Sequence, residues 1–118
     1  MIINNAAGVS AVETSDEIVG RGPVYRRELM SAAQTGGHGI LLVTFEPGAR
    51  LNFHVHDHEQ ILIVTEGTGI VATKDEERTV TAGDVVYIAP GENHWHGATK
   101  DSRFSHLAIQ RPGIRLAE

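Results

Sequence analysis

The sequence contains no cysteine among its 118 residues. Disulfide frameworks, zinc sites with thiolate ligands and cysteine nucleophiles are therefore excluded together. A metal site in this chain must use nitrogen and oxygen ligands, and the seven histidines are its possible nitrogen donors.

The sequence also lacks any cluster of positive charge. Its formal net charge is −5 with histidine neutral, and no basic arm or stripe is present. A nucleic-acid backbone is bound through lysine and arginine, so we expect no nucleic-acid partner. Residues 1–17 have neither the basic start nor the long apolar run of a secretion signal or membrane span. We therefore expect a cytoplasmic protein with no membrane association.

No stretch shows helical periodicity, whereas short β-branched and aliphatic runs recur about every ten residues between glycine-rich turns. These runs predict strands at 24–30, 40–46, 60–66, 70–74, 78–81, 85–89 and 103–110, with a break at 67–69. Residues 31–39 are predicted to form a loop, and residues 1–23 an arm or outer strand. The length fits one domain over 1–118. The fold class indicated is all-β, an antiparallel sandwich or small barrel.

Three histidines alternate along one stretch, at His54, His56 and His58. Alternate side chains of a strand project from the same face, so His54 and His56 can share a metal ion. A tight turn predicted at residues 57–59 would direct His58 elsewhere. A lone His-x-His pair is more often an ordinary polar strand surface, and the interpretation depends on the residues around it.

Those surrounding residues resemble the two sequence motifs of the cupin family in order and spacing. The motifs read Gly48-x5-His54-x-His56-x3-Gln60-x6-Gly67 and Gly83-x5-Ala89-x-Gly91-x2-His94. The resemblance covers about residues 40–110. It implies a double-stranded β-helix, or jelly-roll, barrel over about residues 24–111, with ligands inside one open end. It also implies that His54, His56 and His94 bind metal, with Gln60 in place of the usual glutamate. Ala89 and Ala98 stand where the family has proline and asparagine.

Longer phrases are similar to one group of cupins. VTFEPGAR, QILIVTEGTG, GDVVYIAPGENHWHGA and SHLAIQ look like the small cupins related to carboxymuconolactone decarboxylase fusions. Some of these are manganese-dependent hydroxynitrile lyases with the same ligand types. Residues 56–60 are also similar to small cupins of uronate-sugar catabolism. Both resemblances imply one divalent metal, manganese first and iron, nickel, cobalt or zinc as alternatives, acting as a Lewis acid on a small oxygenated substrate.

The amide of Gln60 is the informative departure from the family pattern. Three imidazoles and an amide are all neutral, so a divalent ion keeps its full charge and is a stronger Lewis acid. This favours a metal-dependent lyase or isomerase of the hydroxynitrile-lyase type. Three alternatives stay open: Gln60 only hydrogen-bonds a ligand, the protein is a ferrous cupin dioxygenase, or it is a non-catalytic ligand-binding module.

Further residues are predicted to complete the site from their strand parity. His96 shares parity with His94, and His106 with Gln110, so His96, His106 and Gln110 form the predicted catalytic set. His106 is the preferred general base, since neutral imidazole suits proton transfer near pH 7. For His96 a structural hydrogen bond is the competing interpretation.

For several further side chains the sequence predicts a position but no chemical role. Leu41 and Val43 are predicted to make the substrate pocket apolar, although core packing would explain them equally well. Trp95 has the opposite parity to His94 and is predicted to pack outside the pocket. His38 and His58 are expected to be exposed. A homodimer or higher homo-oligomer is expected because a sheet edge near the N-terminus needs covering.

Overall fold

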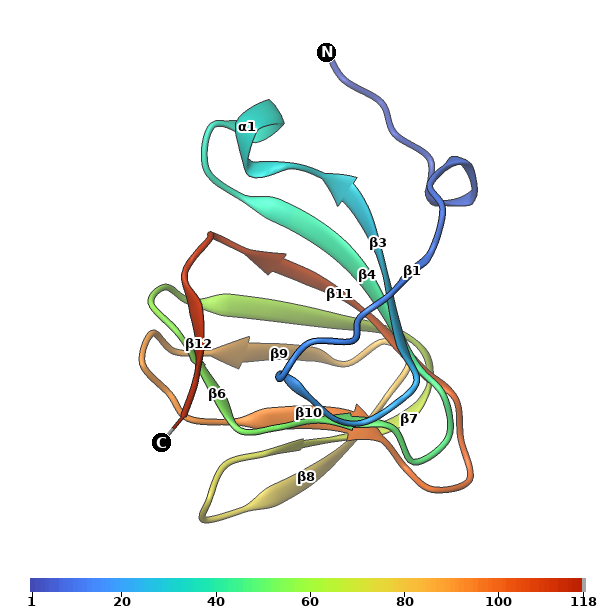
Figure 1. Ribbon diagram of the computed structural model, residues 1–118, viewed down its shortest axis with the longest axis vertical. Helices are drawn as coiled ribbons and strands as arrows, with labels where there is room; N and C mark the ends of the chain where they lie inside the picture. Colours follow the sequence, from blue (N-terminus) through green and yellow to red (C-terminus); the bar gives the residue numbers. More distant parts are fainter. Residues whose placement is uncertain (118) are drawn as a thin grey trace.

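The computed structural model describes residues 1–117, and strands make up nearly all of its regular structure. The strands curl into an antiparallel jelly-roll barrel, which confirms the predicted fold class (Figure 1). The strands are β1 (Val12–Glu13), β2 (Val19–Arg21), β3 (Val24–Met30), β4 (Gly39–Phe45), β5 (Arg50–Leu51), β6 (His54–His56), β7 (Gln60–Ala72), β8 (Glu77–Thr81), β9 (Val85–Ile88), β10 (Trp95–Ala98), β11 (Phe104–Gln110) and β12 (Ile114–Leu116).

One long strand, β7, joins the two sides of the barrel. Residues 60–67 of β7 pair with β11, and residues 60–63 also pair with β9. Residues 68–72 pair with β8, and residues 69–72 also pair with β10. The predicted break at residues 67–69 is therefore wrong. Gly67 has φ +73°, and a Cβ there would collide with the Arg103 carbonyl oxygen. Glycine lets the strand bend from one sheet into the other, where we expected it to end.

Two short helical turns interrupt the strands. Residues Ala6–Gly8 form a 3-10 turn and Ala32–Thr35 form α1, within the segment that was predicted to be a loop. The α1 turn is held by a capping box, in which Ser31 and Gln34 exchange side-chain and backbone hydrogen bonds. Such a turn is too short to give a periodic signal. No helix within residues 1–117 is long and apolar enough to cross a membrane.

The barrel interior has an apolar end and a polar end. The apolar cluster contains Val24, Phe45, Ala49, Leu51, Val64, Val80, Ala98 and Phe104, all buried. Phe45 and Phe104 are fully buried there, with ring centroids 5.7 Å apart. The buried polar residues at the other end include five histidines and a glutamine: His54, His56, Gln60, His94, His96 and His106. The strands thus enclose a packed core at one end and a polar site at the other.

The C-terminal segment adds a strand beside the polar end. Strand β12 pairs with β6, with Ile114 opposite His56 and Leu116 opposite His54. Figure 1 shows β12 running along β6 at the same side of the barrel. No pattern in residues 112–118 had predicted this strand, because its partner lies about sixty residues earlier in the chain.

The edge of β3 is covered only in part. Strand β1 pairs with it at two positions, Val12 and Glu13. Elsewhere on the surface, Val85 and Tyr87 of β9 are 67% and 65% exposed. Isolated exposed apolar side chains are common on protein surfaces, so these two do not by themselves indicate a partner. The homodimer expected from the sequence stays a prediction.

Candidate metal centre

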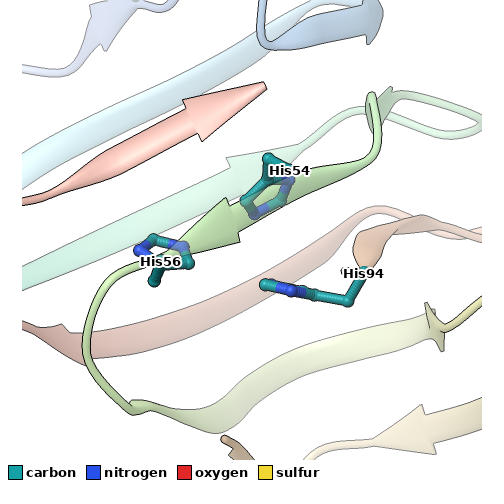
Figure 2. Close-up of side chains that lie close together, drawn as sticks. All are labelled: His54, His56 and His94. Atoms are coloured by element: carbon teal, nitrogen blue, oxygen red, sulfur yellow. The ribbon is translucent and has the colours of Figure 1, made fainter. Parts of the chain in front are cut away.

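Two chain segments bring three histidine rings together at the polar end of the barrel. His54 and His56 come from β6, and His94 precedes β10. His54 and His94 exchange both backbone hydrogen bonds, at 2.9 and 3.1 Å. Figure 2 shows the three rings converging, and one ring nitrogen from each lies within 4.8 Å of the other two. This is the spacing of ligands around one ion.

Backbone hydrogen bonds select the ring nitrogens that can bind a metal. The Nδ1 atom of His54 lies 2.8 Å from the Asn52 carbonyl, and that of His94 lies 2.9 Å from the Glu92 carbonyl. A carbonyl only accepts, so each Nδ1 carries the proton and each Nε2 has a free lone pair. Neither ring nitrogen of His56 has a hydrogen-bond partner among the described residues.

Gln60 adds an oxygen to this cluster. Its Oε1 lies 3.2 Å from Nε2 of His94, while its Nε2 donates to Oε1 of Gln110. Since His94 Nε2 has no proton, two acceptors face each other across that 3.2 Å. Buried acceptors need a donor or a cation as partner. The lone pairs of His54, His94 and Gln60, with a nitrogen of His56, therefore fit a divalent ion.

Burial keeps these rings neutral at pH 7. It lowers the pKa of His54 to about 3, with further lowering by His94, and lowers the pKa of His56 to about 4. The pKa of His94 is also lowered, again mainly by burial. A protonated ring cannot ligate, so the depressed pKa values keep the ligands available across the neutral range.

A second pair of histidines lies beside the metal cluster. His96 and His106 are buried, and His96 Nδ1 lies 3.1 Å from His106 Nε2. The centroids of the His54 and His96 rings are 5.3 Å apart, which links the pair to the metal cluster. Burial lowers the pKa of His106 to about 4 and that of His96 well below its usual value. Each neutral ring has one N–H and one lone pair, and the hydrogen bond between the rings uses one of each. The outer nitrogen of one ring therefore keeps a lone pair, and the outer nitrogen of the other keeps an N–H.

A cavity of about 500 Å³ opens onto both groups. It is lined by His54, His56, Gln60, His96, His106 and Gln110, and by the apolar Leu41, Val43 and Ala108. The structure thus brings the predicted catalytic and pocket residues to one cavity. Thr14, Asp16, Glu17, Arg26 and the β12 residues also line it, and the sequence had not indicated them. Except for Arg26 of β3, they come from the terminal segments, whose positions depend on long-range pairing.

The remaining singled-out side chains lie outside this cavity. His58 is exposed in the bend between β6 and β7, as expected. His38 lies in the loop before β4 but is half-buried, so the prediction that it is exposed was wrong. Trp95 is buried, and the Arg50 guanidinium lies 3.7 Å from the centre of its ring. The parity argument had predicted that Trp95 points away from the metal ligands.

Comparison with protein families shows which family shares this fold and this histidine arrangement. A family model described as a cupin domain matches residues 41–109, more than half of the chain. The chain belongs to the cupin family. The matched segment contains all four proposed ligands and the His96–His106 pair.

Among curated cupin relatives, an (R)-mandelonitrile lyase of Granulicella tundricola is 49% identical over 69 residues, which are 58% of this chain and 53% of the lyase. An (S)-ureidoglycine aminohydrolase of Arabidopsis thaliana is 33% identical over 82 residues, 69% of this chain and 28% of that protein. The matches therefore span about half or less of these relatives.

Solved cupin structures agree with the fold. A cupin-like protein of Thermotoga maritima is 33% identical, with a TM-score of 0.83 over 89% of this chain and 83% of that chain. The polyketide cyclase RemF of Streptomyces resistomycificus has a TM-score of 0.85 over 100% of this chain and 86% of its own, at 18% identity. The second likeness concerns the barrel alone.

Proposed function

We propose that this cupin is a metal-dependent lyase of the hydroxynitrile-lyase type, which cleaves a cyanohydrin into an aldehyde and hydrogen cyanide. The observation that carries the proposal is a wholly neutral ligand set, His54, His56, His94 and Gln60, of which His54, His56 and Gln60 line a cavity with apolar walls. The similarity to a relative named (R)-mandelonitrile lyase supports the substrate class. Manganese is the proposed metal, and an imidazole–amide donor set is also compatible with iron, nickel, cobalt or zinc.

The apolar wall suits the organic part of such a substrate. Leu41, Val43 and Ala108 line the same cavity as the ligands and offer no hydrogen-bonding groups. An aromatic or aliphatic substituent would pack against them and displace water. When bound, the ion would supply a Lewis acid that stabilises negative charge developing on the substrate oxygen.

The His96–His106 pair provides the proton transfers. Lyase cleavage removes the hydroxyl proton, breaks the bond between carbon and the cyano group, and releases cyanide with the electron pair. Whichever ring donates across the 3.1 Å contact, the pair retains one lone pair and one N–H at its two outer nitrogens. The lone pair accepts the hydroxyl proton, and the N–H end protonates cyanide. Both rings are neutral near pH 7 because burial lowers their pKa values.

Benzaldehyde release from racemic mandelonitrile tests this activity, measured by absorbance on manganese-loaded and on chelator-treated protein. We expect metal-dependent cleavage that is lost in His56→Ala and retained in the matched control His58→Ala, which changes an exposed histidine outside the cavity. Replacing His106 by Asn should lower kcat while metal content is unchanged. Failure of the metal-loaded protein to cleave any aromatic or aliphatic cyanohydrin would overturn the proposal, and iron-dependent oxygen consumption would favour the dioxygenase alternative.

A further inference from the structure

Two glutamine side chains face each other at the polar end of the barrel. Gln60 is the first residue of β7 and Gln110 the last of β11, and they are directly opposite in the strand pairing. The amide nitrogen of Gln60 donates to Oε1 of Gln110 at 2.5 Å. The amide oxygen of Gln60 therefore points to the other side, 3.2 Å from His94 Nε2.

An amide of this kind has two orientations of nearly equal shape. A half-turn of the Gln60 amide would exchange its oxygen and its NH2 group, so only the hydrogen-bond partners decide between the two. On the His94 side, Nε2 has a lone pair, because Nδ1 donates to the Glu92 carbonyl at 2.9 Å. An inward NH2 group would donate to that lone pair.

The reversed orientation would close the metal site. A hydrogen bond from Gln60 to His94 Nε2 would occupy the lone pair that His94 needs for a metal, and would present a nitrogen without a lone pair in place of the oxygen. In a metal-free protein His94 alone would favour this reversed amide. On the opposite side of the Gln60 amide, Oε1 of Gln110 accepts from the Gln60 nitrogen. This hydrogen bond keeps the Gln60 oxygen on the side of His94.

We infer that Gln110 is a positioning residue for the metal centre: by accepting from Gln60 Nε2, it directs the Gln60 carbonyl oxygen toward the ion. It is an alternative to the catalytic role predicted for Gln110 from strand parity, which stays a prediction. The inference rests on the metal site of the proposed function, and it concerns ion affinity rather than the reaction. Gln110 is half-buried and lies outside the three-histidine cluster, so it acts through Gln60.

The first test compares two variants of matched length by titration calorimetry with Mn²⁺. Gln110→Met removes the acceptor, and we expect affinity to fall about 10–100-fold, as for other groups that orient a ligand. Gln110→Glu keeps an acceptor-only group facing Gln60 Nε2, so affinity should be retained or increased. Thermal unfolding of the metal-free variants checks that both are folded.

The second test repeats Gln110→Met in a Gln60→Glu background. A carboxylate presents two equivalent oxygens and needs no partner to choose between them. The affinity loss caused by Gln110→Met should therefore shrink to well below tenfold in that background. The visible spectrum of the Co²⁺-loaded Gln110→Met protein should match that of Co²⁺-loaded Gln60→Ala, because both lack the inward oxygen.

Equal losses in the two backgrounds would overturn the inference, since they would mean that Gln110 acts on the ion directly or on folding. An unchanged affinity of Gln110→Met in the parent protein would overturn it as well. These titrations use no cyanohydrin, so a lack of lyase activity leaves their outcome unaffected. A parent protein that binds no divalent ion would overturn both the inference and the proposed function.

Discussion

The side chains of β11 that face the barrel interior run from the apolar end of the barrel to its polar end, so this one strand shows how the two ends differ. It begins at Phe104, fully buried against Phe45, and ends at Gln110, which contacts Gln60 beside the metal ligands. At the Phe104 end apolar atoms fill the space, whereas at the Gln110 end buried ring nitrogens lack partners. Burial of apolar surface stabilises a fold, and unpaired buried polar atoms cost stability. We conclude that the Phe104 end is a closed apolar core, whereas the Gln110 end combines a smaller apolar cluster with ring nitrogens that are free to bind a ligand.

The largest expected effect is on metal binding at the polar end. His56→Ala removes one of three converging rings. Loss of a residue that only supports a ligand typically lowers metal affinity about 10–100-fold, so loss of a ligand itself should lower the affinity for Mn²⁺ further. The metal-free protein should lose less stability than it does with Phe104→Ala, because the lost ring lines an existing cavity and had no hydrogen-bond partner. Elemental analysis and chemical denaturation measure the two quantities. His58→Ala is the matched control, and a large loss of stability in His56→Ala would contradict the contrast between the two ends.

The next effect is on stability at the apolar end. Phe104→Ala should lower the free energy of unfolding by about 3–5 kcal/mol, since a fully buried ring leaves a cavity. Denaturant unfolding gives this value, with Phe104→Leu as a milder control. Below the unfolding transition, the variant should still bind one equivalent of metal. Lost metal binding in the folded variant would show that the two ends are coupled.

A smaller effect per pH unit is expected when the pH is lowered. The folded-state pKa values of His54 and His56, about 3 and about 4, lie below the usual 6.5. Between pH 6.5 and about pH 4 the unfolded chain therefore binds more protons, and the metal-free protein loses stability as pH falls, by about 1.4 kcal/mol per pH unit for each such histidine. Urea unfolding at several pH values measures this slope. The slope should be shallower in His56→Ala, and an unchanged slope would show that His56 does not contribute.

Local patterns predicted the parts of the site that depend on neighbours in sequence. Alternation placed His54 and His56 on one face, and β6 does end at His56 before a bend, as expected from residues 57–59. His94 is different, because its place beside His54 comes from a backbone pairing between segments forty residues apart. Only the resemblance to the cupin motifs predicted that meeting.

The missed features share a physical cause. Gly67 was taken as the end of a strand, since glycine is common in turns, but the same freedom allows β7 to bend and continue. The pairing of β12 with β6 depends on contacts that no local pattern contains. The orientation of the Gln60 amide depends on which atom of Gln110 faces it, a detail that the residue types alone leave open.

Trp95 gives the protein a built-in optical probe. It is the single tryptophan of the chain and lies between His94 and His96 in sequence, with its ring against Arg50 and outside the cavity. Its fluorescence comes from one defined position next to His94 in sequence, so an emission change on adding metal would report binding without any attached dye. The same signal would follow unfolding, so occupancy and folding can be read from one cuvette.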